Sequence, residues 1–370
     1  MYKVIEYELG ELLLYEQPGA YIVETTEYSD SYPVPVLTAG KSFILGYTND
    51  KTGIFDKLPV IIFDDFTTAT QYVNFPFKVK SSAMKILHVN RELVLPKYIY
   101  YRMQIIQFDH STHKRYWIQQ YSKIKIEIPP LDEQERIVAR IEELFSQLDS
   151  GVETLRKTKQ QLAVYRQSVL KEAFEKTPKR ISLGSISETR LGKMLDKEKN
   201  VGEPRHYLRN INVRWFGFDL GDLLEMRIED SEVDKYSLRK GDLVICEGGE
   251  PGRCAVWEAD DSIFYQKALH RVRFTDDSDP KFYMYYLWYA AQTGQLKSLF
   301  TGTGIKHLTG QSLVKVQVPT AESRAQELIV NEIESRLSVC DSIEQTVDTT
   351  LQQAEAMRQS ILKQAFEGEI

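Results

Sequence analysis

Polar and cationic side chains whose chemistry suits DNA gather in one stretch of the second half of the chain. The stretch holds Arg205, His206, Arg209, Asn210, Asn212 and Arg214. Arginine and asparagine can hydrogen-bond to base edges, while cations hold the phosphates. Because alternate residues of a strand point to one face, Asn210, Asn212 and Arg214 could act together if the stretch is extended. The competing interpretation is plain, since charges on a strand are more often just a solvated face.

Smaller groups of the same kind occur elsewhere in the chain. They are Arg190 with Lys193, Lys306 with His307, and His113, Lys114 and Arg115. The pair at 306–307 follows a Thr-Gly-Thr-Gly turn, and the group at 113–115 occupies the corresponding place in the first half. This paired placement favours these two groups as parts of one kind of binding surface. The glycine-rich run at 248–252 is instead typical of a turn, because its glycines supply backbone angles that other residues resist.

Side chains arranged for catalysis or metal binding are not found. Residues 74–77 resemble the Asn-Pro-Pro-Phe loop of adenine methyltransferases, but the second position is Phe75 and no glycine-rich cofactor loop precedes it. Asp64-Asp65 lack the acid-x-Lys partner of a nuclease and are expected to form a turn or a surface pair. The histidines do not pair, and the three cysteines fit no zinc motif. The sequence therefore predicts a non-catalytic chain that binds no metal and no cofactor itself.

Composition and charge are those of a globular protein. Hydrophobic residues make up 42% of the chain and charged residues 27%, with a net charge of −6. All the excess acid lies in residues 320–370, so residues 1–129 and 178–319 are almost neutral and can each carry a basic face. No run of eighteen apolar residues and no signal-peptide pattern occurs, and the cysteine count is odd. We therefore expect a cytoplasmic protein without a membrane partner.

The sequence indicates an internal repeat, in which one ancestral unit is present twice. YRQSVLKEAFE at 165–175 matches MRQSILKQAFE at 357–367, an offset of 192 residues. Upstream, KIKIEIP at 123–129 matches LVKVQVP at 313–319. Apolar residues recur at alternating spacings of three and four through the end of each unit, which indicates a heptad seam. Each seam predicts a helix of about forty residues, roughly 60 Å long, with Asp132-x-x-Glu135 and Ser323 with Gln326 as starting caps.

The segments before these helices have a different pattern. Short β-rich runs at 60–63, 73–79, 243–246 and 263–265 are separated by turn residues. A tyrosine-rich helical piece, expected to lie in the core, follows in each segment. The sequence therefore predicts an α+β protein: two globular domains, 1–129 and 178–319, separated by two long helices, 130–177 and 320–370. We expect the helices to pack as an antiparallel coiled coil, which makes the chain a pseudo-two-fold repeat.

Several of these runs resemble one known family. IPPLDEQERIVARIEELFSQLD with YRQSVLKEAFE, and the final MRQSILKQAFEGEI, resemble the helical regions of Type I restriction–modification specificity subunits. YLRNINVRWFGFDL, GDLVICEGGEPGR, QKALHRVRF and GTGIKHLTG resemble one class of their target-recognition domains, and PVLTAGKSFILGYT and IIFDDFTT another. The resemblance covers essentially the whole chain. The second class adds five candidate DNA-binding residues: Lys41, Tyr47, Thr48, Thr67 and Thr68.

The resemblance implies a function and a set of partners. Each globular domain would read one half of an asymmetric bipartite target in double-stranded DNA. The helix pair would set the gap and dock two methyltransferase subunits, which carry S-adenosylmethionine. Restriction/translocase subunits would join where cutting occurs. Two alternatives remain: a coiled-coil protein-interaction scaffold without DNA recognition, which the acidic last helix favours, and an enzyme acting alone.

Overall fold

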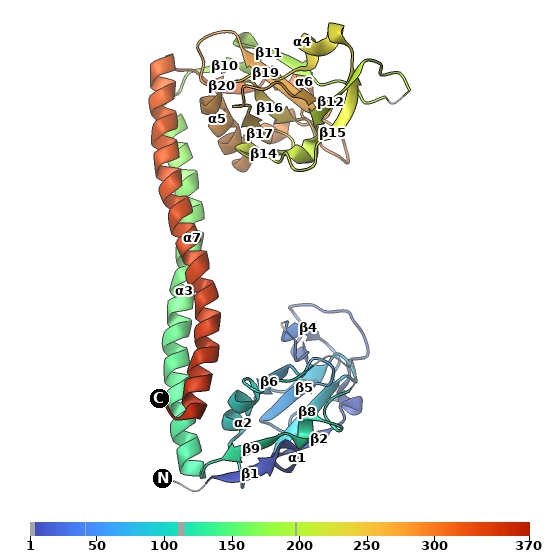
Figure 1. The fold of residues 1–370 in the computed structure, drawn as a ribbon, viewed down its shortest axis with the longest axis vertical. Helices are drawn as coiled ribbons and strands as arrows, with labels where there is room; N and C mark the ends of the chain where they lie inside the picture. The colour runs from blue at the N-terminus through green and yellow to red at the C-terminus, as the bar shows by residue number, and fades with distance from the viewer. Residues whose placement is uncertain (1–3, 41, 110–114, 197) are drawn as a thin grey trace. The chain divides into compact units, whose positions relative to one another are not determined.

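The structure, a computed structural model, describes residues 4–40, 42–109, 115–196 and 198–370. The chain divides into two compact units, Met1–Arg156 with Asp348–Ile370, and Lys157–Val347. Each unit holds one β-rich globule and part of both long helices, α3 (Leu131–Glu175) and α7 (Ser323–Glu367) (Figure 1). The predicted α+β class is confirmed.

The two long helices run antiparallel in each unit. Both have 45 residues, which corresponds to about 68 Å. In the first unit Arg358 of α7 pairs with Asp149 of α3. In the second unit Arg166 of α3 pairs with Asp341 of α7 at 2.7 Å. Part of the predicted seam is buried, at Ile137, Ile141, Leu162, Val169, Ile333, Leu337, Cys340, Val347, Ala354 and Ile361. Its other predicted members are half-buried at Leu144, Leu148, Val152, Leu155 and Leu351, and Tyr165 is exposed, so its place in the seam is wrong.

The first globule contains three small sheets. Its elements are β1 (Ile5–Glu8), α1 (Leu9–Leu12), β2 (Leu13–Glu16), β3 (Val34–Leu37), β4 (Ile44–Thr48), β5 (Val60–Asp64), β6 (Thr70–Val73), β7 (Lys78–Val79), β8 (Met84–Val89), α2 (Pro96–Met103) and β9 (Lys125–Ile128). An antiparallel sheet has the order β2-β8-β5-β6, and a mixed sheet the order β4-β3-β7. Strand β1 pairs with β9, which leads into α3. The predicted strand at 73–79 is wrong, because residues 74–77, with Pro76, separate β6 from β7.

The second globule repeats this topology with a different sequence. Its elements are β10 (Arg180–Ser182), β11 (Ser187–Leu191), β12 (Glu203–Leu208), β13 (Val213–Arg214), β14 (Gly217–Phe218), β15 (Leu224–Ile228), α4 (Val233–Tyr236), β16 (Leu243–Cys246), β17 (Cys254–Val256), β18 (Phe264–Tyr265), β19 (Leu269–Phe274), α5 (Pro280–Gln292), α6 (Gly310–Leu313) and β20 (Gln317–Pro319). The sheet β11-β19-β16-β17 corresponds to β2-β8-β5-β6, and β15-β12-β18 to β4-β3-β7. Strand β10 pairs with β20 as β1 does with β9. The repeat that the helix sequences show therefore extends to the fold of the globules.

A buried glutamine joins each globule to its following helix. The Leu95 amide donates to Gln134 Oε1 at 2.8 Å, and Gln134 Nε2 donates to the Pro129 carbonyl at 2.9 Å. In the second unit the Asp279 amide donates to Gln326 Oε1 at 2.9 Å, and Gln326 Nε2 donates to a carbonyl at 2.8 Å. The predicted pairing of Gln326 with Ser323 as a cap is therefore wrong. Its side chain satisfies backbone groups that burial would otherwise leave unpaired.

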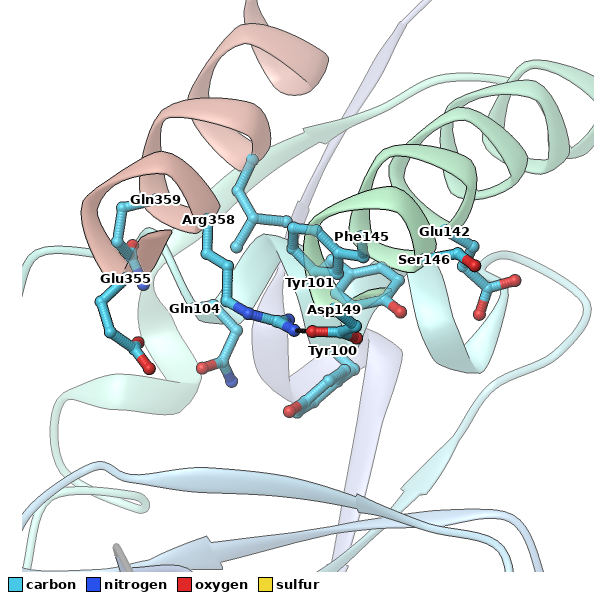
Figure 2. A pocket seen from close by; sticks show the side chains of 11 residues that line it. Tyr100, Tyr101, Gln104, Glu142, Phe145, Ser146, Asp149, Glu355, Arg358 and Gln359 are labelled. Carbon is cyan, nitrogen blue, oxygen red and sulfur yellow. Dashed lines mark hydrogen bonds and ion pairs between the residues drawn. The ribbon is translucent and has the colours of Figure 1, made fainter. Parts of the chain in front are cut away.

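A pocket of about 630 Å³ lies in the first unit, between α2 and the two long helices (Figure 2). Arg358 crosses it to reach Asp149, and its guanidinium carbon lies 4.6 Å from the centre of the Phe145 ring. Tyr100 and Tyr101 of α2 form another part of the lining. The pocket thus belongs to the junction between globule and helices.

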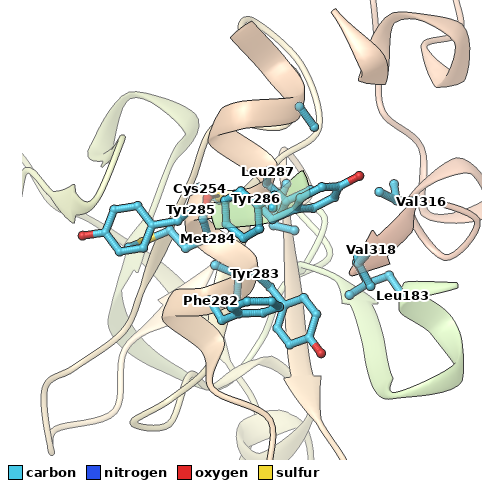
Figure 3. Close-up of a cluster of buried hydrophobic side chains, with 14 of the residues drawn as sticks. Leu183, Cys254, Phe282, Tyr283, Met284, Tyr285, Tyr286, Leu287, Val316 and Val318 are labelled. Atoms are coloured by element: carbon cyan, nitrogen blue, oxygen red, sulfur yellow. Dashed lines mark hydrogen bonds between the residues drawn. The ribbon is translucent and has the colours of Figure 1, made fainter. Parts of the chain in front are cut away.

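The tyrosine-rich helices form the centre of the globular cores, as predicted. In the second unit Phe282, Tyr283 and Leu287 of α5 are almost completely buried (Figure 3). Phe174 of α3 packs edge-on against Phe282, with ring centres 5.5 Å apart. In the first unit Tyr98 of α2 lies in the corresponding core. Each globule is thus anchored on the long helices by aromatic packing.

Among the residues that the structure describes, no helix combines the length and the apolar character needed to cross a bilayer.

Candidate DNA interface

The stretch from 205 to 214 is not one strand. Strand β12 ends at Leu208, and Asn210–Asn212 form a 3₁₀ turn. The prediction that Asn210, Asn212 and Arg214 alternate on one face is therefore wrong. The cause is local, because the Arg209 amide donates to Asn212 Oδ1 at 2.8 Å, and short amide side chains of this kind compete with strand pairing. Asn212 is buried, so its side chain shapes the loop.

Asn210 instead lies at the centre of a hydrogen-bond network. Its Nδ2 donates to the Gly248 carbonyl at 2.7 Å, in the turn between β16 and β17. Its Oδ1 accepts from Arg253 Nη2 at 2.9 Å. The same turn carries Glu250, which accepts from Trp215 Nε1 at 2.8 Å. The sequence interpretation of 248–252 as a turn alone missed this network. The available signal was Glu250 within the glycine run and Arg253 directly after it.

The segment with Lys306 and His307 joins the same cluster. Thr301 and His307 exchange two backbone hydrogen bonds, at 2.8 and 2.9 Å, which close a narrow loop. A side chain at Gly248 would place its Cβ 3.0 Å from His307 Nδ1, so glycine leaves room for the His307 ring here. Lys306 is exposed and donates to the Gly302 carbonyl at 2.8 Å. Three segments far apart in the sequence therefore meet: the 3₁₀ turn, the glycine-rich turn and the loop at 301–307.

The other candidates of the second unit differ in exposure. Arg214 is 55% exposed and lies 3.5 Å from Asp219. Arg190 is also exposed, on β11. Arg205 and Arg209 are partly buried and pair with Asp230 and Asp222, at 3.3 and 2.6 Å. Lys193 is buried beside Glu232, so it acts first as a structural cation. All of these stay candidates for DNA contact.

In the first unit the corresponding turn lies between β5 and β6. It contains Thr67, which is exposed, and Thr68, whose φ is +56°. The guanidinium carbon of Arg115 lies 6.0 Å from the centre of the Phe66 ring in this turn. The structure thus brings Arg115 to the turn as it brings His307 to the glycine-rich turn. Lys41, His113 and Lys114 lie outside the described residues.

Tyr47 and Thr48 lie on β4, in the other sheet of this globule. Thr48 is buried, and its Oγ1 accepts from the Asp50 amide at 3.2 Å. Tyr47 is partly exposed and its carbonyl accepts from the Ser29 amide at 3.1 Å. Of the two, only Tyr47 presents its side chain to solvent.

Asp64 and Asp65 have separate structural tasks. Asp64 Oδ1 accepts from the amides of Phe66 and Thr67, at 2.9 Å each, which confirms the expected turn. Asp65 is 1% exposed, so the alternative of a surface pair is wrong for it. Its carboxylate lies 3.3 Å from the ammonium of buried Lys85 and accepts from the Trp117 amide at 2.8 Å. Asp65 therefore fixes the segment that follows Arg115.

A buried histidine supports the corresponding segment of the second unit. His270 is 1% exposed, and its Nε2 lies 2.9 Å from the Leu308 carbonyl oxygen, next to His307. Burial lowers the pKa of His270 below its usual value, so the neutral ring donates this hydrogen bond. Burial likewise raises the pKa of Cys246 to about 11, so its thiol stays protonated.

The His270 environment predicts a pH-dependent stability. Because the unfolded imidazole keeps the higher pKa, the unfolded state binds more protons, and stability is lost as pH falls below about 6.5. The second globule should therefore melt at a lower temperature at pH 5.5 than at pH 7.5. His270→Gln, which keeps a donor without titrating there, should show a smaller difference. Equal losses in both proteins would exclude His270 as the cause.

A family model described as the Type I restriction modification DNA specificity domain matches residues 2–163. The chain is also similar to two specificity subunits of Escherichia coli restriction enzymes. It is 50% identical to the EcoR124I/EcoR124II specificity subunit over 146 residues, which is 38% of this chain and 36% of that protein. It is 28% identical to the EcoKI specificity subunit of strain K12 over 273 residues, 68% of this chain and 58% of that protein. The chain thus spans between about a third and three fifths of these relatives.

Two solved structures have the same fold at 16% sequence identity. One, described as the structural basis of complex assembly and conformational transition of the type I R-M system, matches with a TM-score of 0.73 over 100% of both chains. The other, the HsdS subunit from Thermoanaerobacter tengcongensis, matches with a TM-score of 0.59 over 99% of this chain and 97% of that one.

Proposed function

We propose that the chain is a specificity subunit of a Type I restriction–modification enzyme and selects the DNA sequence on which that enzyme acts; the specificity-domain match over residues 2–163 and the similarity to two such subunits support this. Residues 1–129 and 178–319 are recognition domains that each read one half of an asymmetric bipartite target. Residues 130–177 and 320–370 form the spacer that sets the gap. The observation that carries the proposal is one sheet order present in both globules, with different side chains in the matching turns after β5 and β16.

The helix pair is the docking surface for two methyltransferase subunits in this proposal. Large apolar side chains remain exposed along it, among them Val164, Leu328 and Val339 at 57–65%. These side chains would lose their exposure if a partner covered the helix pair. The methyltransferase partners bind S-adenosylmethionine and supply the chemistry, in the cytoplasm, and restriction/translocase subunits complete a cutting enzyme. The chain itself supplies sequence reading and spacing.

Replacing Arg214 by Ala tests the recognition role. In the complex with the methyltransferase, the variant should lose affinity about tenfold or more for a duplex carrying the target, through one half-site only. Arg239→Ala is the matched control: Arg239 is 58% exposed, pairs with Asp234, and precedes the start of β16, whereas the glycine-rich turn follows the end of that strand. Equal loss at both half-sites would indicate general destabilisation instead.

Salt dependence separates this function from that of a scaffold. Phosphate contacts release counterions, so the affinity of the complex for duplex DNA should fall steeply between 50 and 200 mM salt, by roughly a thousandfold for about six contacts. A scaffold without a DNA role would show no salt-sensitive affinity beyond that of the methyltransferase measured alone.

A further inference from the structure

The glycine-rich turn between β16 and β17 presents an oriented carboxylate to solvent. The Glu250 side chain is 53% exposed. Its Oε1 accepts from Trp215 Nε1 at 2.8 Å, and its Oε2 accepts from Arg253 Nη1 at 2.9 Å. Each carboxylate oxygen can accept from more than one donor. Glu250 is therefore held in place and still has acceptor capacity on its exposed side.

The backbone beneath Glu250 is equally constrained. Gly249 and Gly252 have φ values of +71° and +95°, a region that favours glycine. The Arg253 amide donates to the Glu250 carbonyl at 3.1 Å. Arg253 also binds Asn210, which binds Gly248, so the network closes on itself. A side chain held in this way can discriminate between ligands, because little conformational freedom is lost when it binds.

An exposed carboxylate has a restricted choice of partners on DNA. A carboxylate repels phosphate. In the major groove, the only base groups that can donate a hydrogen bond to it are the amino groups of cytosine and adenine. Adenine presents N7, an acceptor, beside its amino group, and N7 would repel the second carboxylate oxygen. Resting on the function proposed above, we propose that Glu250 reads the N4 amino group of a cytosine in one half-site. Trp215 and Arg253 position it.

The matching turn of the first globule has different chemistry. There the acid at the start of the turn, Asp64, directs its Oδ1 to the amides of Phe66 and Thr67. The exposed side chains of that turn are Phe66 and Thr67, and the Thr67 hydroxyl both donates and accepts. Because this turn presents no exposed carboxylate, the effect of Glu250 must be confined to one half-site.

The test is Glu250→Gln in the complex with the methyltransferase, followed by genome-wide mapping of N6-methyladenine. An amide can pair with adenine N6 and N7. The variant should therefore relax one C·G requirement at least tenfold, with A·T accepted there and every other position retained. Asp260→Asn, at an 87% exposed acid elsewhere in this globule, should leave the motif unchanged.

Each outcome decides a separate point. An unchanged motif in Glu250→Gln, or a half-site without any C·G pair, would overturn the role of Glu250 while leaving the function intact. No motif from the unaltered complex would overturn the proposed function itself. If the Glu250→Gln variant does not assemble with the methyltransferase, Trp215→Phe tests the role of Glu250 instead. This variant removes only the hydrogen bond from Trp215 Nε1 that positions the carboxylate. Weaker discrimination at a single C·G pair is expected from it, and unchanged discrimination would contradict the proposal.

Discussion

Deleting one heptad from each long helix should shorten the gap in the recognised target and leave its bases unchanged. The segments to remove are 155–161 of α3 and 345–351 of α7. Each lies between the two ion pairs that join the helices, Asp149–Arg358 and Arg166–Asp341. Seven residues are two turns, so the seam keeps its register. The helices lose about 10.5 Å, which corresponds to at most about three base pairs. Methylome mapping of the assembled variant measures the new gap.

The control deletes 155–161 alone. The two helices then no longer match in length, and the complex should fail to assemble or should methylate poorly. New bases in either half-site of the double deletion, or an unchanged gap, would contradict the spacer role of the helices.

Asp65→Ala should destabilise the first globule by about 3–5 kcal/mol. The substitution leaves the Lys85 ammonium, which is 1% exposed, without its carboxylate, and leaves the Trp117 amide without its acceptor. Hydrogen exchange of the β5 and β8 amides measures the loss as a lower local unfolding free energy. Because Asp65 fixes the segment after Arg115, we expect the Asp65→Ala variant also to lose recognition of one half-site.

The double variant Asp65→Asn/Lys85→Met provides the control. It removes both charges, keeps an acceptor for the Trp117 amide, and should recover most of the lost stability. Glu6→Ala breaks an exposed pair with Lys125 and should have little effect. A loss as large in the double variant as in Asp65→Ala would show that the buried charge is not the cause.

The sequence was sufficient for the features that depend on periodicity. Heptad spacing locates α3 and α7, and apolar patterning places Tyr98 and Phe282 in the core. The repeat follows from matched residues, and the structure extends it to sheet order. The division of the chain into four functional segments remains a prediction.

Features that depend on side-chain hydrogen bonds could not be predicted. Asn212 converts an expected strand into a 3₁₀ turn by accepting from a backbone amide. Gln326 has the spacing of a cap, yet it reaches a residue 47 positions earlier. Lys193 looks like a surface cation and is buried against Glu232. In each case the deciding partner is chosen by tertiary contact, which local pattern does not encode.

Co-expression with a methyltransferase subunit of the same system, followed by genome-wide mapping of N6-methyladenine, tests whether this chain selects the DNA target. We expect a single interrupted, asymmetric motif that disappears when this chain is omitted. A stable and active complex that produces no such motif, or one that produces the same motif without this chain, would contradict it.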